Sequence, residues 1–260
     1  MRLEDYSAEI ENHRKWLASF GNNRLTNWKQ LLAADPEAAV VEACTREFLQ
    51  EHVAEVKPAE DPTSGGPDFC CAQAGHRFYV EATCMKEAAV TQATGLPPLP
   101  EGAFDFGTLT PKVLDECRNK APQCSRLDAP CLLAIGTVHP AASVICFNRD
   151  FVPEVLTGDT MITMRFDAKR GQAVGKPYQT TDLHNASFLR PLTRSDDGLD
   201  HLVVRRSISG LLLCGFGCNP YNVNGVLHPK SVRPFDRALL PDVPFCTLGH
   251  GYTEGKFKWV

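Results

Sequence analysis

Asp68 and Glu81 are the acidic residues whose setting in this sequence most favours a chemical role. Asp68 follows Gly65-Gly66-Pro67 at the start of an apolar run, and Glu81 lies thirteen positions later inside a second apolar run. Carboxylate oxygens are the ligands that hard divalent cations prefer. The pair therefore suggests a cation site, provided that the chain brings the two side chains together.

Residues 67–84 predict two antiparallel strands joined by a tight turn at Ala74-Gly75. With this turn, Gln73 pairs with His76 and Asp68 falls opposite Glu81, where Cβ atoms lie ~5 Å apart. Two like charges at that distance destabilise the hairpin unless a cation offsets them. If the loop is instead Gly75-His76, Asp68 faces Thr83 and Glu81 is diagonal to it, still within reach of a shared ion.

The two faces of the predicted hairpin differ in polarity. The face with the carboxylates also carries Tyr79 and Thr83, whereas the opposite face is apolar along both strands: Phe69, Cys71, Phe78, Val80, Ala82 and Cys84. This alternation supports the register. An open, solvated sheet face is the alternative interpretation of the two acids.

The segments Gly66-Pro67-Asp68-Phe69 and Val80-Glu81-Ala82-Thr83 resemble the signature of the PD-(D/E)xK nuclease superfamily. The resemblance covers roughly residues 36–138. It implies the restriction-endonuclease-like α/β fold, a mixed central sheet flanked by helices with the signature on a hairpin. It also implies that Asp68 and Glu81 bind one or two Mg²⁺ ions, with Mn²⁺ as a substitute. Members often add an acid from an upstream helix, and Glu42 matches that position.

Thr83 departs from the family pattern, because the family lysine follows the second acid by two positions. That lysine positions the attacking water and stabilises developing negative charge. Threonine offers a hydroxyl to a water but carries no charge. Either the chain is an inactive relative or a lysine comes from elsewhere.

Lys120 is the first candidate for the replacement. It lies on a predicted helix beside a stripe formed by Val113, Cys117 and Cys124. In some family members the charged residue has moved to this following helix, and Gln123 fits a polar residue seen nearby. The alternative interpretation is a lysine that extends to solvent at a helix end, and Pro122 makes a helix through Gln123 doubtful. Lys86, five residues after Glu81, is the second candidate.

The resemblance therefore implies a metal-dependent nuclease that hydrolyses phosphodiester bonds, with DNA as the expected substrate. A metal held by Asp68, Glu81 and Glu42 would activate a water, and Lys120 would orient that water or bind the phosphate. The alternative is a catalytically inactive nuclease-fold protein that serves as a nucleic-acid or protein binding module.

Three further groups in the C-terminal half have simpler interpretations. A zinc site from Cys214, Cys218, His228, Cys246 and His250 has irregular spacing, and Cys214 continues an apolar run typical of a core strand. Four arginines could face a phosphate backbone, although we expect a solvated face instead: Arg205, Arg206, Arg233 and Arg237. The segment 256–259 mixes charge and aromatic residues, and we expect an edge strand or a tail there rather than a base-stacking surface.

Helical periodicity dominates the first 50 residues, with a break around residues 21–23 and a helix over 37–51 capped by Asp35. We expect strands at 52–56, 130–138, 143–147, 161–166 and 208–216, a helix over 110–121, an inserted loop over 91–107 and irregular packing in the last 45 residues. These elements predict a single α/β domain over 1–260, with its core in 36–170 and an irregular C-terminal elaboration over 171–260.

The composition is that of a globular chain. Of 260 residues, 43% are hydrophobic and 22% charged, and the net charge is −4. Residues 1–108 hold 9 basic against 17 acidic residues, so the strong positive charge of a non-specific DNA binder is lacking. No apolar run approaches the ~20 residues of a membrane span, and the first residues lack a secretory signal. The eleven cysteines predict reduced thiols and a cytoplasmic protein, and a homo-oligomer is compatible with the sequence.

Overall fold

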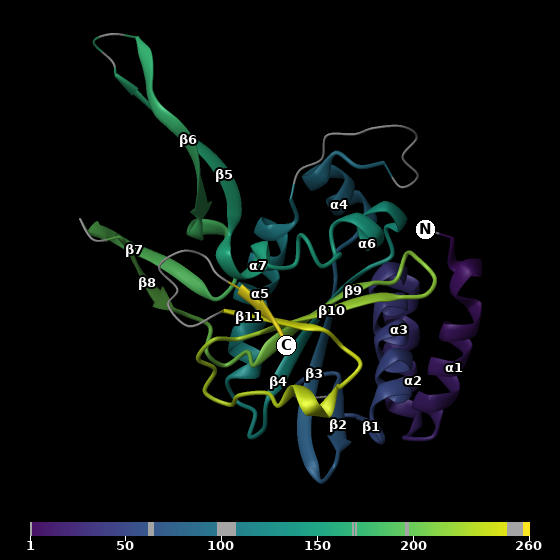
Figure 1. The fold of residues 1–260 in the computed structure, drawn as a ribbon. Helices are drawn as coiled ribbons and strands as arrows, with labels where there is room; N and C mark the ends of the chain where they lie inside the picture. Colours follow the sequence, from purple (N-terminus) through teal and green to yellow (C-terminus); the bar gives the residue numbers. More distant parts are fainter. Residues whose placement is uncertain are drawn as a thin grey trace.

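The computed structural model describes residues 2–61, 65–97, 108–167, 169, 171–195, 198–248 and 257–260. Its architecture is α/β, with one large mixed sheet flanked by helices (Figure 1). The predicted mixed α/β class is thus confirmed.

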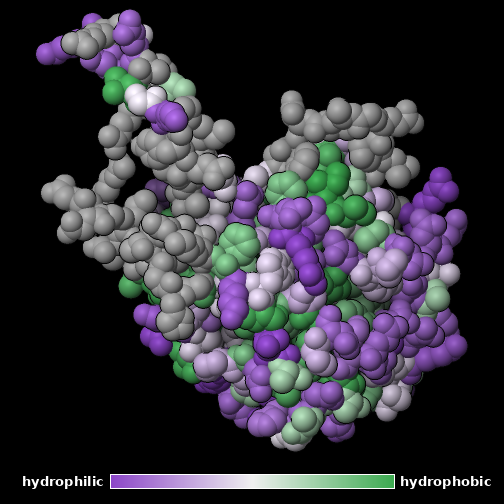
Figure 2. Space-filling model, viewed as in Figure 1, coloured by the Kyte–Doolittle hydropathy of each residue, from purple (hydrophilic) through white to green (hydrophobic). Residues whose placement is uncertain are grey.

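The N-terminal segment is helical, as the periodicity predicts. It consists of a short 3₁₀ helix and three α-helices: η1 (Leu3–Tyr6), α1 (Ser7–Ala18), α2 (Asn22–Ala34) and α3 (Pro36–His52). Asp35 caps α3, because its Oδ1 accepts a hydrogen bond from the Ala38 amide, and Pro36 occupies the first helical position. Helices α1–α3 lie side by side on the right of Figure 1, under the mainly hydrophilic surface of Figure 2.

The central sheet has eight strands in the order β1-β2-β3-β4-β9-β10-β11-β12. Strand β4 pairs in parallel with both β3 and β9, and the other neighbours are antiparallel except β10 and β11. The strands of this sheet are β1 (Glu55–Pro58), β2 (Phe69–Gln73), β3 (His76–Cys84), β4 (Cys131–Thr137), β9 (Gly210–Gly215), β10 (Asn222–Leu227), β11 (Phe245–Leu248) and β12 (Phe257–Trp259).

Both faces of the central sheet are buried, and β4 shows this most clearly. Leu132 and Ala134 contribute to the core that also contains Val41 and Phe48 of α3. Leu133 and Ile135 alternate to the other face and contribute to a second core. A strand with helices on both sides reads as a continuous apolar run, and all seven residues of β4 are buried.

Strands β2 and β3 form the predicted hairpin. Gln73 pairs with His76 and Phe69 with Val80, which confirms the register derived from a turn at Ala74-Gly75. Ala74 and Gly75 have φ of 50° and 80°. Two central residues with positive φ match the right-handed twist of the strands that they join.

Four further helices lie C-terminal to β3: α4 (Glu87–Thr94), α5 (Thr110–Cys124), α6 (Pro140–Ile145) and α7 (Glu154–Thr157). Helix α5 runs through Pro122, so the expected end near Ala121 is three residues early. A proline this close to the C-terminal end removes one intrahelical hydrogen bond, and the helix continues for two residues. Of the expected loop 91–107, residues 91–94 belong to α4 and 98–107 lie outside the described residues.

The expected strand over 143–147 is wrong, because α6 covers Pro140–Ile145. His139 caps this helix through its Nδ1, which accepts from the Ala142 amide at 3.1 Å, and Pro140 occupies the first turn. These two start signals outweigh the strand preference of Val144 and Ile145.

The expectation of irregular packing after residue 215 is wrong for three segments, since β10, β11 and β12 all join the central sheet. The edge strand expected at the C-terminus is present as β12. Two hairpins lie outside the central sheet: β5 (Asp159–Asp167) with β6 (Gln172–Asp182), and β7 (Leu189–Ser195) with β8 (Gly198–Val203). The β5–β6 pair extends from the body as a long arm (Figure 1). The remaining elements are the 3₁₀ helices η2 (Leu183–Asn185) and η3 (Arg237–Leu239).

No helix among the described residues combines the length and the apolar character that crossing a membrane requires. All eleven cysteines are free.

Candidate functional site

A cleft opens where β2 and β3 separate. Strand β2 begins at Phe69, but β3 continues past Val80 to Cys84 and pairs only with β4 there. The chain before β2 bends away at Asp68. The resulting space, about 330 Å³, is here called the carboxylate cleft, and its charged lining residues are Asp35, Glu42, Glu60, Asp68, Glu81 and Lys120.

Asp68 lies at the point where β2 and β3 separate. Its Oδ2 accepts a hydrogen bond of 2.6 Å from the Ala82 amide, so the side chain replaces a strand partner at the edge of β3. The pKa of Asp68 is raised well above its usual value, because burial disfavours the charged form and Glu81 and Glu42 add negative charge nearby. A positive charge brought to this carboxylate would relieve both effects.

Glu81 is 4% exposed, which is unusual for a glutamate without full pairing. Its Oε1 accepts a hydrogen bond of 2.6 Å from the Lys120 Nζ. Its Oε2 is buried and has no partner among the residues that the structure describes. Burial raises the pKa of Glu81, and the neighbouring ammonium of Lys120 only partly offsets that rise.

Lys120 projects from the last turns of α5 to Glu81, so the structure places the predicted replacement lysine directly beside the second acid. Burial alone would lower its pKa, but Glu81 and then Asp68 outweigh burial and raise the pKa above the usual value. Lys120 is therefore a cation near neutral pH. Gln123, one turn further along α5, also lines the cleft.

Thr83 is hydrogen-bonded to α5 rather than to Asp68 or Glu81. Its Oγ1 donates to Glu116 Oε2 at 2.7 Å, although Thr83 also lines the cleft. Lys86, the second lysine candidate, pairs with Asp35 Oδ2 at 2.7 Å beside the N-terminus of α3. That ion pair engages the Lys86 amine with Asp35 rather than with Asp68 or Glu81.

Glu42 reaches the cleft from α3, on the side opposite α5. Its Oε1 lies 3.3 Å from Nε2 of His13, a fully buried residue of α1, although the two groups lack the alignment of a hydrogen bond. The predicted acid of the upstream helix thus shares the cleft with Asp68 and Glu81.

The described residues contain no group of three Asp, Glu, His or Cys side chains arranged to hold one metal ion. The fit of a divalent cation rests instead on the unpartnered Glu81 Oε2 and on the raised pKa of Asp68. Both observations mark a deficit of positive charge in the cleft. Asp68 and Glu81 are the residues that would hold the ion, with Glu42 facing it from α3.

Sequence reasoning missed several residues of this neighbourhood. Glu60 lies in the loop before β2, and burial followed by the charge of Glu42 raises its pKa. No periodic pattern in that loop signals it. Glu116 had a signal, because it precedes Lys120 by four positions and such residues share one helix face. His13 and Arg24 come from α1 and α2, whose packing on α3 the sequence does not encode locally.

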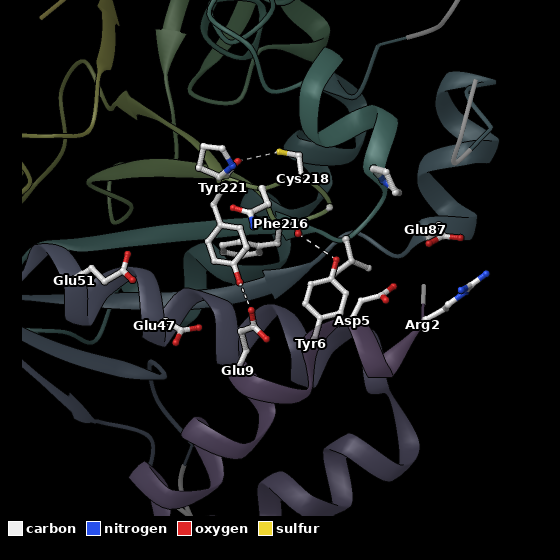
Figure 3. A pocket seen from close by; sticks show the side chains of 15 residues that line it. Arg2, Asp5, Tyr6, Glu9, Glu47, Glu51, Glu87, Phe216, Cys218 and Tyr221 are labelled. Atoms are coloured by element: carbon white, nitrogen blue, oxygen red, sulfur yellow. Dashed lines mark hydrogen bonds between the residues drawn. The ribbon is translucent and has the colours of Figure 1, made fainter. Parts of the chain in front are cut away.

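A larger cavity, about 890 Å³, lies on the other side of α3 between η1 and the turn at Cys218–Tyr221 (Figure 3). Its carboxylates are spread around the opening: Asp5, Glu9, Glu47, Glu51 and Glu87. The Tyr6 hydroxyl donates to the Phe216 carbonyl and the Tyr221 hydroxyl to Glu9. The described lining residues of this cavity include no lysine paired with a buried acid, unlike Lys120 and Glu81 of the carboxylate cleft, so we place the chemistry in the smaller space.

The zinc residues considered in the sequence do not come together among the described positions. Cys214 packs in the core beneath α3, whereas Cys246 packs in the core on the opposite face of the sheet. Both ring nitrogens of His228 contact the backbone, at Val204 and Lys230, and burial lowers its pKa to about 4. His250 lies outside the described residues.

No protein-family model, no curated protein and no solved structure matches this chain.

Proposed function

We propose that this chain is a metal-dependent nuclease with a restriction-endonuclease-like arrangement, and that its substrate is DNA. The observation that carries the proposal is the contact between Lys120 and Glu81 beside Asp68. Lys120 supplies, from α5, the positive charge that Thr83 on β3 lacks.

The charge balance of the cleft supports a bound cation. Glu42, Glu60, Asp68 and Glu81 face a single lysine among the described lining residues. Burial and the neighbouring carboxylates disfavour ionisation here, as the raised pKa values of Asp68, Glu81 and Glu60 show. A divalent ion is the simplest compensation, and Asp68 and Glu81 would hold it.

Each residue then has a separate role in phosphodiester hydrolysis. A bound Mg²⁺ or Mn²⁺ supplies a water of lowered pKa and polarises the phosphate. Asp68 and Glu81 would hold and orient the ion. Lys120 stays protonated beside Glu81 and stabilises the negative charge that develops as the water oxygen bonds to phosphorus and the bond to the leaving oxygen breaks. Glu42, beside His13, would face the ion from α3 and could accept a hydrogen bond there.

The test is cleavage of supercoiled plasmid and of circular single-stranded DNA with millimolar Mg²⁺ or Mn²⁺. We expect wild-type cleavage and a loss of about 100-fold or more in rate for Asp68→Asn, Glu81→Gln and Lys120→Met. The first two changes weaken the hold on the metal ion, and the third removes the cation that stabilises the developing negative charge. Asn and Gln keep the size of the native side chains.

Asp128→Asn is the matched control. Asp128 is an exposed acid beside the same hairpin that pairs with Arg77 and Tyr79, away from the cleft. Its loss should leave the cleavage rate unchanged. Cleavage by Asp68→Asn and Glu81→Gln at the wild-type rate would reject this site.

A catalytically inactive binding module is the second candidate, and the absence of a preformed three-ligand group among the described residues favours it. Calorimetric titration with Mn²⁺ separates the two functions. Binding that disappears in Asp68→Asn supports the nuclease, whereas no binding at millimolar Mn²⁺ supports the inactive module.

A further inference from the structure

A second hollow adjoins the carboxylate cleft. It measures about 240 Å³ and shares Leu31, Glu42, Glu60 and Asp68 with the cleft. Its other wall comes from α1 and α2 and carries Trp16, Arg24, Asn27 and Trp28. We call this hollow the tryptophan pocket.

Trp28 brings an unused donor to the tryptophan pocket. The side chain is 3% exposed, and its Nε1 has no hydrogen-bond partner among the described residues. The ring is held in place by His13, whose centroid lies 4.7 Å away. A buried donor left unpaired costs free energy, so a ligand that presents an acceptor at this position gains from pairing with it.

Trp16 supplies an aromatic surface to the same pocket. Its half-buried ring is braced by Phe20 and Phe69, with centroids at 5.3 and 6.0 Å. A braced ring with one accessible side stacks on a planar ligand at little cost in side-chain entropy. The polar rim is formed by Arg24, which donates to the Glu60 carbonyl, and by the exposed amide of Asn27.

The acids that line both the carboxylate cleft and the tryptophan pocket determine which part of a ligand can enter the pocket. Glu42, Glu60 and Asp68 repel a phosphate that lacks a metal ion beside it, whereas a neutral planar ring with acceptor atoms suits Trp16 and Trp28. Nucleobases have this chemistry, and stacking on aromatic side chains is the usual mode of binding to unpaired strands.

We propose that the tryptophan pocket holds one unpaired nucleobase of a single strand, next to the phosphate bound in the carboxylate cleft. This inference rests on the proposed function and refines its substrate to single-stranded nucleic acid. A base inside a duplex is stacked and paired on both sides and reaches such a pocket only after extrusion. The pocket therefore discriminates against intact duplex.

The test measures binding without hydrolysis. The probe is a fluorescent oligothymidylate with methylphosphonate linkages, whose neutral backbone avoids repulsion by the acids. Fluorescence anisotropy in EDTA should show tighter binding of the single strand than of its duplex with a complementary strand. Replacing its bases by abasic units should abolish binding.

Two variants address the two tryptophans separately. Trp16→Ala should weaken binding about 5- to 150-fold, the range for loss of one stacked base. Trp28→Phe keeps the packed ring and deletes only the Nε1 donor, and should weaken binding about 2- to 10-fold. Trp28→Phe retains the packing even if Trp16→Ala disturbs the helices.

Trp259→Ala is the control, because Trp259 lies on β12 at the far edge of the sheet from β1. Its binding should equal that of the wild type. Equal affinity for duplex and single strand, no binding by the wild type, or no loss in Trp28→Phe would each overturn the inference. Plasmid cleavage without single-strand preference rejects the pocket alone, and single-strand binding without any cleavage rejects the nuclease alone.

Discussion

Glu81 lies between two residues of opposite charge, and this position explains the electrostatics of the cleft. Lys120 binds one of its oxygens, while the carboxylate of Asp68, bound to the Ala82 amide, adds a negative charge nearby. The lysine neutralises one carboxylate but not two. The excess charge appears as a raised pKa on both acids, with burial as the largest cause for each.

Asp68 should make the metal-free protein less stable as the pH rises. A carboxyl whose pKa is raised by folding binds its proton more tightly in the folded state. Its stabilising contribution is therefore complete below the ordinary pKa of about 4 and is lost as the pH rises through the raised value. Asp68→Asn removes this titration while its amide oxygen still accepts from Ala82.

Thermal unfolding in EDTA checks this expectation at the residue scale. The melting temperature of Asp68→Asn should exceed that of the wild type by an amount that grows from pH 4 to pH 8, by about 2–4 °C for each kcal/mol of relieved repulsion. Adding Mg²⁺ should stabilise the wild type more at pH 8 than at pH 5, with little effect on the variant. A difference independent of pH would exclude Asp68 as the titrating group.

At the scale of elements, local patterns predicted more than long-range contacts. The alternation of apolar residues and the Ala74-Gly75 turn predicted the β2–β3 register, which the structure confirms. The strand expected at 143–147 failed because Pro140 and the cap of His139 favour a helix. Glu60 could not be found from sequence, because its position depends on how the loop before β2 folds back against α3.

The turn between β2 and β3 is not optimal for its backbone. Ala74 has a positive φ, which asparagine tolerates better than alanine. Ala74→Asn should therefore stabilise the protein by about 0.5–1 kcal/mol, whereas Gly75→Ala should destabilise it by about 1–2 kcal/mol. Urea unfolding measures both. Equal changes in the free energy of unfolding for the two substitutions would contradict a turn with positive φ at both positions.

The whole molecule depends on its C-terminal quarter more than the sequence suggests. Strand β9 lies in the middle of the central sheet, next to β4. Phe235 and Phe245 belong to the same core as α3. Strands β10–β12 are short and lie among prolines, so no sustained alternation marks them, which is why they were missed as members of the sheet.

A chain that ends at Ser207 should lack a cooperative fold, because it exposes one edge of β4 and empties part of both cores. Near-ultraviolet circular dichroism and the urea transition test this expectation. The control removes residues 164–177 of the β5–β6 arm and joins Thr163 to Tyr178, which already pair, through Asn-Gly. Such a shortened arm should leave the transition intact. A cooperative transition in the truncated chain would show that residues 2–207 suffice.

The hydrogen bond between Asp68 and the Ala82 amide has a consequence for solubility as well. Where β2 and β3 separate, the unpaired edge of β3 could pair with a strand of another molecule. The Asp68 side chain occupies that edge through its hydrogen bond and blocks such pairing. The bond from the Ala82 amide to Asp68 thus also protects the protein against aggregation, and a substitution that removes the acceptor, such as Asp68→Ala, favours self-association at high concentration.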